Sequence, residues 1–309
     1  MHVLFLGAGK RLSLLESFAR AAEAEALPLR MWSIEGKSQV PIGVLAGTII
    51  GPRFNDPDFG SFLTDVVESH RIDLVIPNMD TATVALATQV EALTALGCSP
   101  IVSSLELCEA MLDKQKAADW FARHHVPQPA PDTYPMIIKS RFGYGARDQA
   151  IVGNSEGRSS FFIDKSPDNY FSQAFIKGPE YTVDAYVDKA GHLVSALSRK
   201  RLEVVGGEVS VSETCRHEQI LEQTARILSQ PGWLGPVTLQ FIDGPNEPVI
   251  LEINPRFGGG VTHSIHCGLD MPRWLMRERL GRPLPSSPTW NSGSVMTRCL
   301  RDIFYDHRS

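Results

Sequence analysis

The sequence predicts an α/β protein that begins with a parallel sheet and continues with mainly antiparallel strands. In the first third, short apolar strands alternate with segments of helical spacing, with strands at 2–6, 29–34 and 74–77 and helices at 13–26, 58–70 and 83–96. This alternation is typical of a parallel sheet covered by helices. A single helix is expected over 105–125. After it the strands follow one another closely, at 136–139, 149–152, 170–176, 181–187 and 192–198, which indicates antiparallel pairing.

Composition and charge narrow the class of protein. The chain has 309 residues, 43% hydrophobic and 21% charged, with a net charge of −5. These values are ordinary for a globular protein of two or three domains, and they predict neither nucleic-acid nor membrane binding. The longest apolar run, 40–50, contains a proline and two glycines and is too short to cross a bilayer.

Targeting and redox signals favour a cytoplasmic protein. The N-terminus has no basic leader and runs directly into an apolar strand, so we expect no signal peptide. The five cysteines are widely scattered, and no pair has the spacing of a metal knuckle or a redox motif. Free thiols in a reducing cytosol are the simplest interpretation.

A strand near the C-terminus presents three polar side chains on one face. Glu252, Asn254 and Arg256 alternate with the apolar Leu251 and Ile253, so the polar three point the same way. Oxygen ligands suit Mg²⁺, and a guanidinium suits a phosphoryl group. The alternative is a strand end with solvated polar residues.

A partner strand makes the metal interpretation stronger. Residues 237–243 are joined to 249–252 by the turn-rich segment 244–248, which predicts a β-hairpin. Gln240 would then lie opposite Glu252. A hairpin that gathers Gln240, Glu252, Asn254 and Arg256 is less expected by chance than the pattern of the strand alone.

A second phosphate signal lies near the middle of the chain. Lys139 ends an apolar strand and precedes a loop that contains Gly143 and Gly145, flanked by Arg141 and Arg147. Glycines allow backbone N–H groups to approach phosphate oxygens, and the arginines are placed to close over a triphosphate. The alternative is a hairpin loop with solvated basic residues.

A candidate adenine segment follows the next strand. Gln173, Phe175 and Ile176 lie at its end, and Glu180 comes seven residues after Gln173. Main-chain groups of such a segment can hold adenine between apolar side chains, while a carboxylate accepts both ribose hydroxyls. Glu180 is otherwise a surface carboxylate at the start of a strand.

The first glycine turn suggests a different nucleotide. Gly7 and Gly9 follow the first strand, as in a dinucleotide-binding fingerprint, but Leu12 occupies the place of the third glycine. Glu35 is the one candidate for a ribose-binding acid. We therefore favour a tight strand-to-helix turn over a nicotinamide site.

The order of these motifs resembles the ATP-grasp superfamily, in its branch related to the large chain of carbamoyl-phosphate synthase. The resemblance covers the whole chain. It implies a parallel α/β pre-ATP-grasp domain at 1–104, followed by a two-lobed ATP-grasp domain. The N-terminal lobe, with the glycine-bearing lid loop, would span 105–174, and the C-terminal lobe, with the metal-binding hairpin, 175–309.

The resemblance also implies a role for individual residues. It makes Lys114, on the helix before the proline-rich connector 126–131, a further phosphate ligand. The residues implied for the nucleotide are Lys114, Lys139, Arg141, Gly143, Gly145, Gln173, Phe175, Ile176 and Glu180. Those implied for metal are Gln240, Glu252 and Asn254, although many relatives carry an acid at the position of Gln240. Gly259 and His263 lie in the region implied for the acceptor substrate.

These roles imply an ATP-dependent carboxylate–amine ligase that acts through an acyl phosphate, with ATP and Mg²⁺ or Mn²⁺ as cofactors. Arg256 and Lys139 would act on the transferred phosphoryl group. The partners expected are a small carboxylate, an amine or other nitrogen nucleophile, and a second copy of the chain in a homodimer. Two alternatives stay open, namely a degenerate ATP-grasp regulatory protein and a nicotinamide-dependent oxidoreductase.

Overall fold

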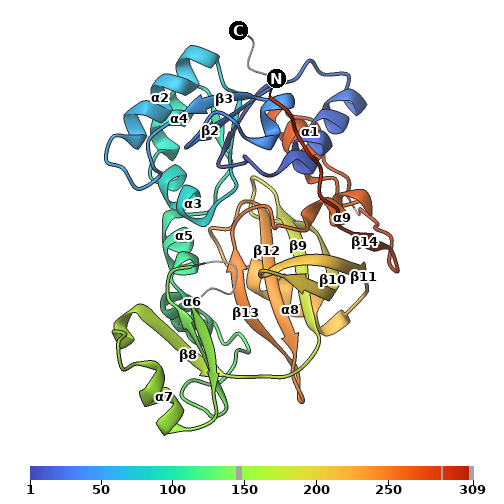
Figure 1. The fold of residues 1–309 in the computed structure, drawn as a ribbon. Coiled ribbons are helices and arrows are strands. Elements are labelled where there is room, and N and C mark those ends of the chain that lie inside the picture. Colours follow the sequence, from blue (N-terminus) through green and yellow to red (C-terminus); the bar gives the residue numbers. More distant parts are fainter. Residues whose placement is uncertain (144–147, 287, 306–309) are drawn as a thin grey trace.

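Three β-sheets organise the computed structural model, which describes residues 1–143, 148–286 and 288–305 (Figure 1). A five-stranded sheet has the order β3-β2-β1-β4-β5, a three-stranded sheet the order β7-β6-β8, and a six-stranded sheet the order β13-β12-β9-β10-β11-β14. The five-stranded and three-stranded sheets lie at opposite ends of the molecule, and the six-stranded sheet lies between them (Figure 1).

The five-stranded sheet is parallel and is covered by helices on both faces. Its strands are β1 (His2–Leu6), β2 (Arg30–Glu35), β3 (Gly47–Ile50), β4 (Leu74–Pro77) and β5 (Ser99–Pro100). The surrounding helices are α1 (Leu12–Ala24), η1 (Pro41–Val44), α2 (Phe59–His70), α3 (Asp80–Ala87) and α4 (Val90–Ala95). Val3 and Phe5 pack with α1, whereas Leu4 and Leu6 pack with α2 and α3. Burial on both faces explains why β1 is apolar throughout.

Two helices lead into the small antiparallel sheet. They are α5 (Leu105–Leu112) and α6 (Lys114–Arg123), followed by β6 (Met136–Ser140), β7 (Gln149–Val152), α7 (Ser155–Phe161), η2 (Pro167–Asn169) and β8 (Tyr170–Ala174). Met136 and Ile138 of β6 pack under the aromatic rings around α7. Because strand side chains alternate, Lys139 points to the other face of this sheet.

The six-stranded sheet has one apolar face and one face with polar side chains. Its elements, with the C-terminal helices, are β9 (Glu180–Val187), β10 (Leu193–Val205), β11 (Glu208–Thr214), α8 (Glu218–Leu228), β12 (Gly235–Asp243), β13 (Pro248–Asn254), α9 (Val261–His266), α10 (Met271–Arg279) and β14 (Val295–Thr297). One face, with Val183, Leu239 and Ile253, is covered by α6 and α8. The opposite face carries polar side chains, among them Gln240 and Glu252.

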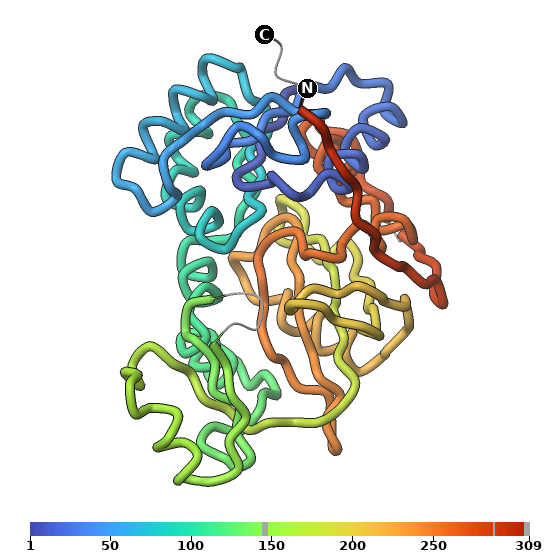
Figure 2. Tube along the Cα trace, in the orientation of Figure 1, coloured from blue at the N-terminus to red at the C-terminus, as the bar shows by residue number. Residues whose placement is uncertain are grey.

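The C-terminal region packs back onto the parallel sheet. Glu25, at the end of α1, accepts hydrogen bonds from three arginines that lie in or just after α10, namely Arg273, Arg277 and Arg282, at 2.5 to 2.8 Å. The segment after β14 then runs beside the start of the chain (Figure 2). Tyr305 donates a hydrogen bond to the carbonyl of Val40. The two ends of the described chain therefore stabilise the same sheet.

The predicted fold class is confirmed, but several elements differ from expectation. The helix expected over 105–125 is two helices, because Asp113 is extended and its side chain caps α6. The helix expected over 83–96 is likewise divided between α3 and α4. The sequence analysis missed β3, β5 and β11. The domain boundaries at 104 and 174 stay a prediction.

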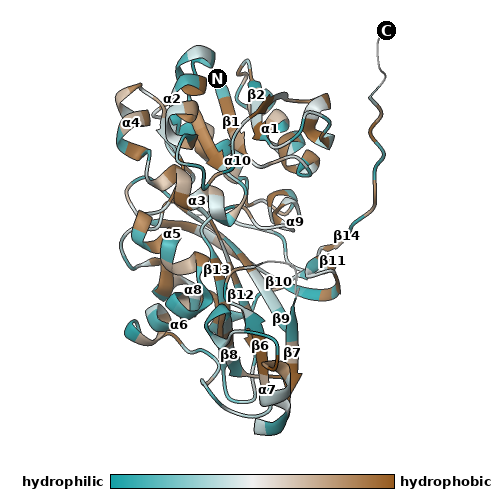
Figure 3. Ribbon diagram, turned by 60° about the vertical axis from the view of Figure 1, so that its left-hand side comes forward, coloured by the Kyte–Doolittle hydropathy of each residue, from teal (hydrophilic) through white to brown (hydrophobic). Residues whose placement is uncertain are grey.

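Hydropathy along the chain follows this architecture. The strand β1 is hydrophobic along its length (Figure 3). Within the described residues, every helix is too short or too polar to pass through a bilayer.

Candidate functional site

The hairpin of β12 and β13 presents the predicted polar side chains together. Gln240 is the cross-strand partner of Glu252, as predicted, and β13 is the edge strand of its sheet. The Asn254 amide donates to Glu252 Oε1 over 3.0 Å. The carboxylate is therefore held in place from its own strand, two residues away.

Two arginines engage the amide oxygens that were predicted to bind metal. Arg201 Nη1 donates to Gln240 Oε1 over 3.2 Å, and Arg256 Nη2 donates to Asn254 Oδ1 over 3.0 Å. No group of three His, Cys, Asp or Glu side chains suited to a metal occurs in the described parts of the chain. Mg²⁺ can bind through one carboxylate with phosphates and water, so Glu252 fits a metal bound together with phosphate. Gln240 and Asn254 would have to release their arginines first.

Arg201 is a site residue that the sequence analysis missed. It lies on β10, its side chain is 7% exposed, and its Nε is 3.4 Å from Glu180 Oε2. Burial lowers the pKa of Arg201, while the charges of Glu180 and Glu252 oppose this effect. Strand alternation places Arg199 and Arg201 on one face, but no local pattern places that strand beside the hairpin.

Lys139 lies between the small sheet and the hairpin. Burial lowers the pKa of its ammonium group, and the nearby Glu252 carboxylate has the largest opposing effect. Lys114 and Glu180 also act on its charge. The structure therefore gathers Lys114, Lys139, Glu180 and Glu252, which are predicted residues from both lobes.

Arg141 forms a two-point ion pair with a protein carboxylate, and its contact with a triphosphate stays a prediction. Its Nε and Nη2 donate to the two oxygens of Asp113 over 2.8 and 2.6 Å. Burial alone would raise the pKa of Asp113, but the hydrogen bonds from Arg141 hold it below its ordinary value. Lys114 Nζ donates to the carbonyl of Gly143 over 3.0 Å. Gly145, like Arg147, lies outside the described residues.

The predicted adenine segment connects the small sheet to the large one. Gln173 is 4% exposed and pairs with Ile137 across β8 and β6. The Phe175 N–H donates to the carbonyl of Pro135 over 2.7 Å, and Phe175 and Ile176 are half-buried. Glu180 follows as the first residue of β9, with a side chain 45% exposed. The segment is thus fixed by backbone contacts and leaves the Glu180 carboxylate accessible.

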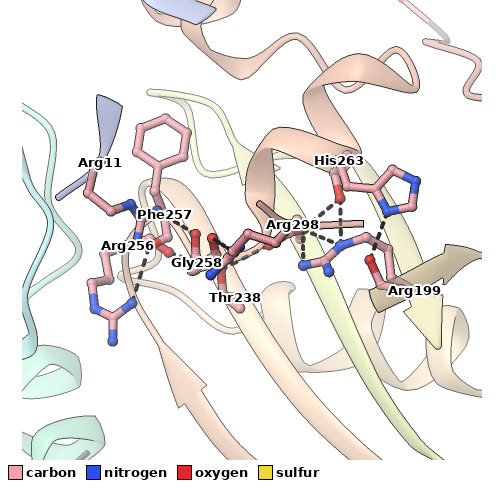
Figure 4. Close-up of polar contacts among 12 residues, drawn as sticks. Arg11, Arg199, Thr238, Arg256, Phe257, Gly258, His263 and Arg298 are labelled. Atoms are coloured by element: carbon pink, nitrogen blue, oxygen red, sulfur yellow. Dashed lines mark hydrogen bonds and ion pairs between the residues drawn. The ribbon is translucent and has the colours of Figure 1, made fainter. Parts of the chain in front are cut away.

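A run of three glycines follows the hairpin, and two of them are packed too closely to carry a side chain. A Cβ at Gly258 would lie 2.7 Å from Thr238 Oγ1, and one at Gly260 would lie 2.7 Å from Arg199 Nη1. Gly259, predicted near the acceptor substrate, is exposed. Figure 4 shows Arg11 and Arg298 on either side of this segment; both were missed from sequence.

His263 is buried, which corrects its predicted contact with substrate. Its ring is 3% exposed, Nδ1 is 2.9 Å from Ser212 Oγ, and Nε2 is 3.2 Å from Ser294 Oγ. Burial and the charge of Arg199 lower its pKa to about 4. The ring is therefore neutral and has both nitrogens occupied, as expected of a residue that supports the fold.

The first glycine turn is filled by a side chain of the protein. The Glu35 carboxylate accepts a hydrogen bond from Ser33 Oγ over 2.6 Å, and the Ala8 N–H donates to the same hydroxyl over 3.3 Å. The carboxylate lies against Gly9, where a Cβ would be 2.8 Å from Glu35 Oε2, and burial raises its pKa while the backbone N–H groups of Gly9 and Ala8 oppose this effect. These N–H groups are the ones that a dinucleotide pyrophosphate would need. The turn is thus a tight strand-to-helix connection, the interpretation favoured from sequence.

Comparison with known proteins connects this geometry to a family. Residues 168–299 match the family described as "ATP-grasp in the biosynthetic pathway with Ter operon". Pyruvate carboxylase of Bacillus subtilis (strain 168) is 28% identical over 149 residues. That match covers 43% of this chain and 13% of the relative, so it spans a small part of that enzyme.

Solved structures show the same fold over nearly the whole chain. A biotin carboxylase domain of 2-oxoglutarate carboxylase from Hydrogenobacter thermophilus, solved with MgADP, ADP and bicarbonate, has a TM-score of 0.75 at 17% identity. That match covers 96% of this chain and 74% of the other. For N5-carboxyaminoimidazole synthetase from Staphylococcus aureus with ADP, the TM-score is 0.75 at 15% identity, over 97% and 82% of the two chains.

The match of residues 168–299 to an ATP-grasp family, together with the fold shared with these ADP-bound structures, confirms the resemblance predicted from the motifs. Within that superfamily, the family matched by residues 168–299 is the one associated with a biosynthetic pathway and the Ter operon.

Proposed function

We propose that this protein is an ATP-dependent ligase that joins a carboxylate to an amine or another nitrogen nucleophile. The observation that carries the proposal is the cluster on the large sheet in which Gln240 pairs with Glu252 and Arg201 contacts both Gln240 and Glu180. Lys139 of the small sheet lies near enough for the Glu252 charge to oppose the lowering of its pKa. A lysine and a metal-binding carboxylate on opposite sides of one site suit a nucleotide triphosphate between them.

The site residues divide among three tasks in this proposal. Lys114, Lys139 and Arg256 neutralise phosphate charge, and the accessible Glu180 accepts the ribose hydroxyls. The segment 173–176 holds adenine through its main chain. Glu252 would hold Mg²⁺ or Mn²⁺, which would supply positive charge to offset that of the phosphates. Arg201, missed from sequence, adds a buried positive charge beside Glu180 and Gln240.

The proposed reaction proceeds through an acyl phosphate. The substrate carboxylate attacks the γ-phosphorus, the bond to the β,γ-bridging oxygen breaks, and ADP leaves. The nitrogen nucleophile then attacks the acyl carbon and phosphate departs. Such phosphoryl transfer depends on positioning and charge neutralisation, which this set of cations supplies. Solved relatives bound to ADP or MgADP support the nucleotide assignment.

An ADP-release screen tests this proposal. A panel of carboxylic acids is assayed with ATP and Mg²⁺, each with and without a panel of amines. An active acid is then incubated with hydroxylamine, which should capture the acyl phosphate as a hydroxamate. ADP and phosphate should form in equal amounts. Release of AMP and pyrophosphate would instead indicate adenylation and would overturn the acyl-phosphate route.

A degenerate, nucleotide-binding regulatory protein is the second candidate. The engagement of the amide oxygens of Gln240 and Asn254 by arginines favours it, because two of the three predicted metal ligands are then occupied. This candidate predicts saturable ATP binding without ADP release across the whole panel.

For the oligomeric state we propose a homodimer, which light scattering would test. One solved relative is described as a dimer.

A further inference from the structure

Two arginines from distant parts of the chain meet at the glycine segment 258–260. Arg11 lies between β1 and α1, and its Nη2 donates to the carbonyl of Gly258. Arg298 follows β14, and its Nη2 donates to the carbonyl of Gly259 over 2.6 Å. In Figure 4 the two side chains approach the segment from opposite sides. Both guanidinium groups are thus anchored by neutral backbone oxygens, which hold their positions without cancelling their charge.

The other arginines around the segment have carboxylate partners, whereas Arg11 has none among the described residues. Arg256 is paired with Asp80, Arg199 with Asp184, and Arg298 with Glu208. Within the described parts of the chain, Arg11 has no carboxylate within ion-pairing distance. Burial and the charge of Arg256 lower the pKa of Arg11 to about 10. The cluster therefore favours an added negative charge.

The partner of Arg298 is easily displaced. Glu208 is 70% exposed at its side chain, whereas Arg298 is 33% exposed. Ion pairs with a solvated partner contribute little to stability, so an incoming anion can replace Glu208. A carboxylate or phosphate at this position would bring together Arg298 and Arg11 as a two-sided clamp.

We propose that Arg11 and Arg298 bind a carboxylate or phosphate group carried by the acceptor substrate, separate from its reacting nitrogen. This inference rests on the proposed ligase function. The acceptor is then an anionic amine, such as an amino acid or an amino-bearing phosphate ester, and Arg11 determines specificity for it.

The location distinguishes this anion from the nucleotide. Glu252 and Lys139 lie at the phosphate end of the proposed ATP site. Arg256 follows Glu252 in the sequence, two residues after the end of β13. The glycine segment lies beyond Arg256, toward the parallel sheet. An acceptor whose nitrogen reached the acyl carbon near Arg256 would extend its remote group toward Gly258 and Arg11.

Anion titration tests the inference without turnover. The melting temperature is measured with saturating ADP and Mg²⁺ while sodium phosphate or sodium succinate is added, against sodium chloride at equal ionic strength. We expect one of the two anions to stabilise the protein in a saturable manner. Arg11→Gln should weaken its apparent affinity by about tenfold or more, and Arg11→Lys by less. The exposed Arg30→Gln variant should match the wild type.

A turnover comparison then identifies the source of the anion. With an active acid, amines that carry a carboxylate or a phosphate are compared with their amides or neutral alcohols by kcat/KM. We expect the anionic amines to be preferred, and Arg11→Gln to remove that preference. Equal anion affinity in wild type and Arg11→Gln, or no response specific to an anion in the wild type, overturns the inference. Absence of ADP release with every pair refutes the ligase proposal instead, and the titration still decides the anion site.

Discussion

Arg256 and Asp80 form a two-point ion pair that joins the end of β13 to the start of α3. Arg256 Nε is 2.6 Å from Asp80 Oδ1, and Nη2 is 2.9 Å from Oδ2. Nη1 donates to the carbonyl of Phe257 over 3.1 Å. Burial alone would lower the pKa of Arg256, but Asp80 holds it above the ordinary value. The guanidinium that we assign to the phosphoryl group is therefore oriented by a carboxylate from the parallel sheet.

Asp80→Asn should slow turnover while leaving nucleotide binding close to that of the wild type. The loss of one charged hydrogen-bond partner frees Arg256 to rotate, and we expect kcat to fall roughly tenfold. Steady-state kinetics and ADP titration measure the two effects. Asp65→Asn, on the exposed face of α2, is the matched control. A wild-type kcat in Asp80→Asn would show that this ion pair has no part in turnover.

Glu252→Gln should abolish ADP release without unfolding the protein. The change keeps the hydrogen bond to Asn254 but removes the carboxylate charge that a metal requires. Because loss of even an outer metal partner costs up to about 100-fold, we expect at least that decrease. Glu247→Gln, in the exposed turn of the same hairpin, is the control. An active Glu252→Gln variant would remove the central assignment of the site.

Lys139→Ala and Glu180→Ala should separate phosphate binding from ribose binding. Lys139→Ala should weaken ATP more than ADP and AMP least, because the lysine is assigned to the phosphates. Glu180→Ala should weaken all three alike. Calorimetric titration of both variants gives the comparison. The same pattern of losses in both variants would mean that the assignment of Lys139 to the phosphates and Glu180 to the ribose is wrong.

The affinity for ATP should also depend on the protonation of Lys139. Its pKa is lowered by burial, so its charge is lost at a lower pH than that of an ordinary lysine. We expect ATP affinity to decline as pH rises through this lowered pKa, and Lys139→Arg to move the decline to higher pH. A wild-type and an arginine variant with the same pH profile would assign the decline to another group.

Glu25→Gln should destabilise the contact between α1 and α10. Hydrogen bonds from Arg273 are the largest cause that lowers the pKa of Glu25 to about 2, with burial opposing. The arginines are partly exposed, so we expect a loss of about 1–3 kcal/mol at neutral pH. Because the folded pKa lies below the unfolded value, the contribution is complete above about pH 4.5 and disappears as pH falls toward 2.

Melting curves of wild type and Glu25→Gln at several pH values measure this difference. The gap between the two proteins should be constant from neutral pH to about 4.5 and should narrow below it. The exposed Glu23→Gln on the same helix is the control. A gap that stays constant down to pH 3 would assign the effect to packing rather than to charge.

The sequence analysis identified the polar face of the hairpin because strand alternation and a short turn are local properties. The register of Gln240 with Glu252 follows directly from them. It did not identify Asp80, Arg201 or Arg11, since each enters the site from an element that only the tertiary fold brings near. His263 shows the opposite case. The sequence analysis placed it in the acceptor region, but its contacts with Ser212 and Ser294, which lie far away in the sequence, could not be predicted.

The break between α5 and α6 has a similar cause. Periodicity alone predicts a continuous helix over 105–125, and no proline or glycine interrupts it. Asp113 is extended because its carboxylate serves two partners at once, the backbone N–H of Gln115 and the guanidinium of Arg141. The second partner lies 28 residues away, beyond the reach of a local pattern.

Glu35 gives the protein an internal substitute for a bound anion. Its carboxylate lies against Gly9 and accepts from Ser33 Oγ, which in turn accepts from the Ala8 N–H. The polar groups that such a turn could offer to a ligand therefore stabilise the parallel sheet instead. A free pyrophosphate would have to compete with a group tethered at very high effective concentration. We therefore expect dinucleotides to be excluded because the Glu35 side chain fills the turn, and not because the turn has the wrong shape. Conversion of the turn into a cofactor pocket must begin with the replacement of Glu35.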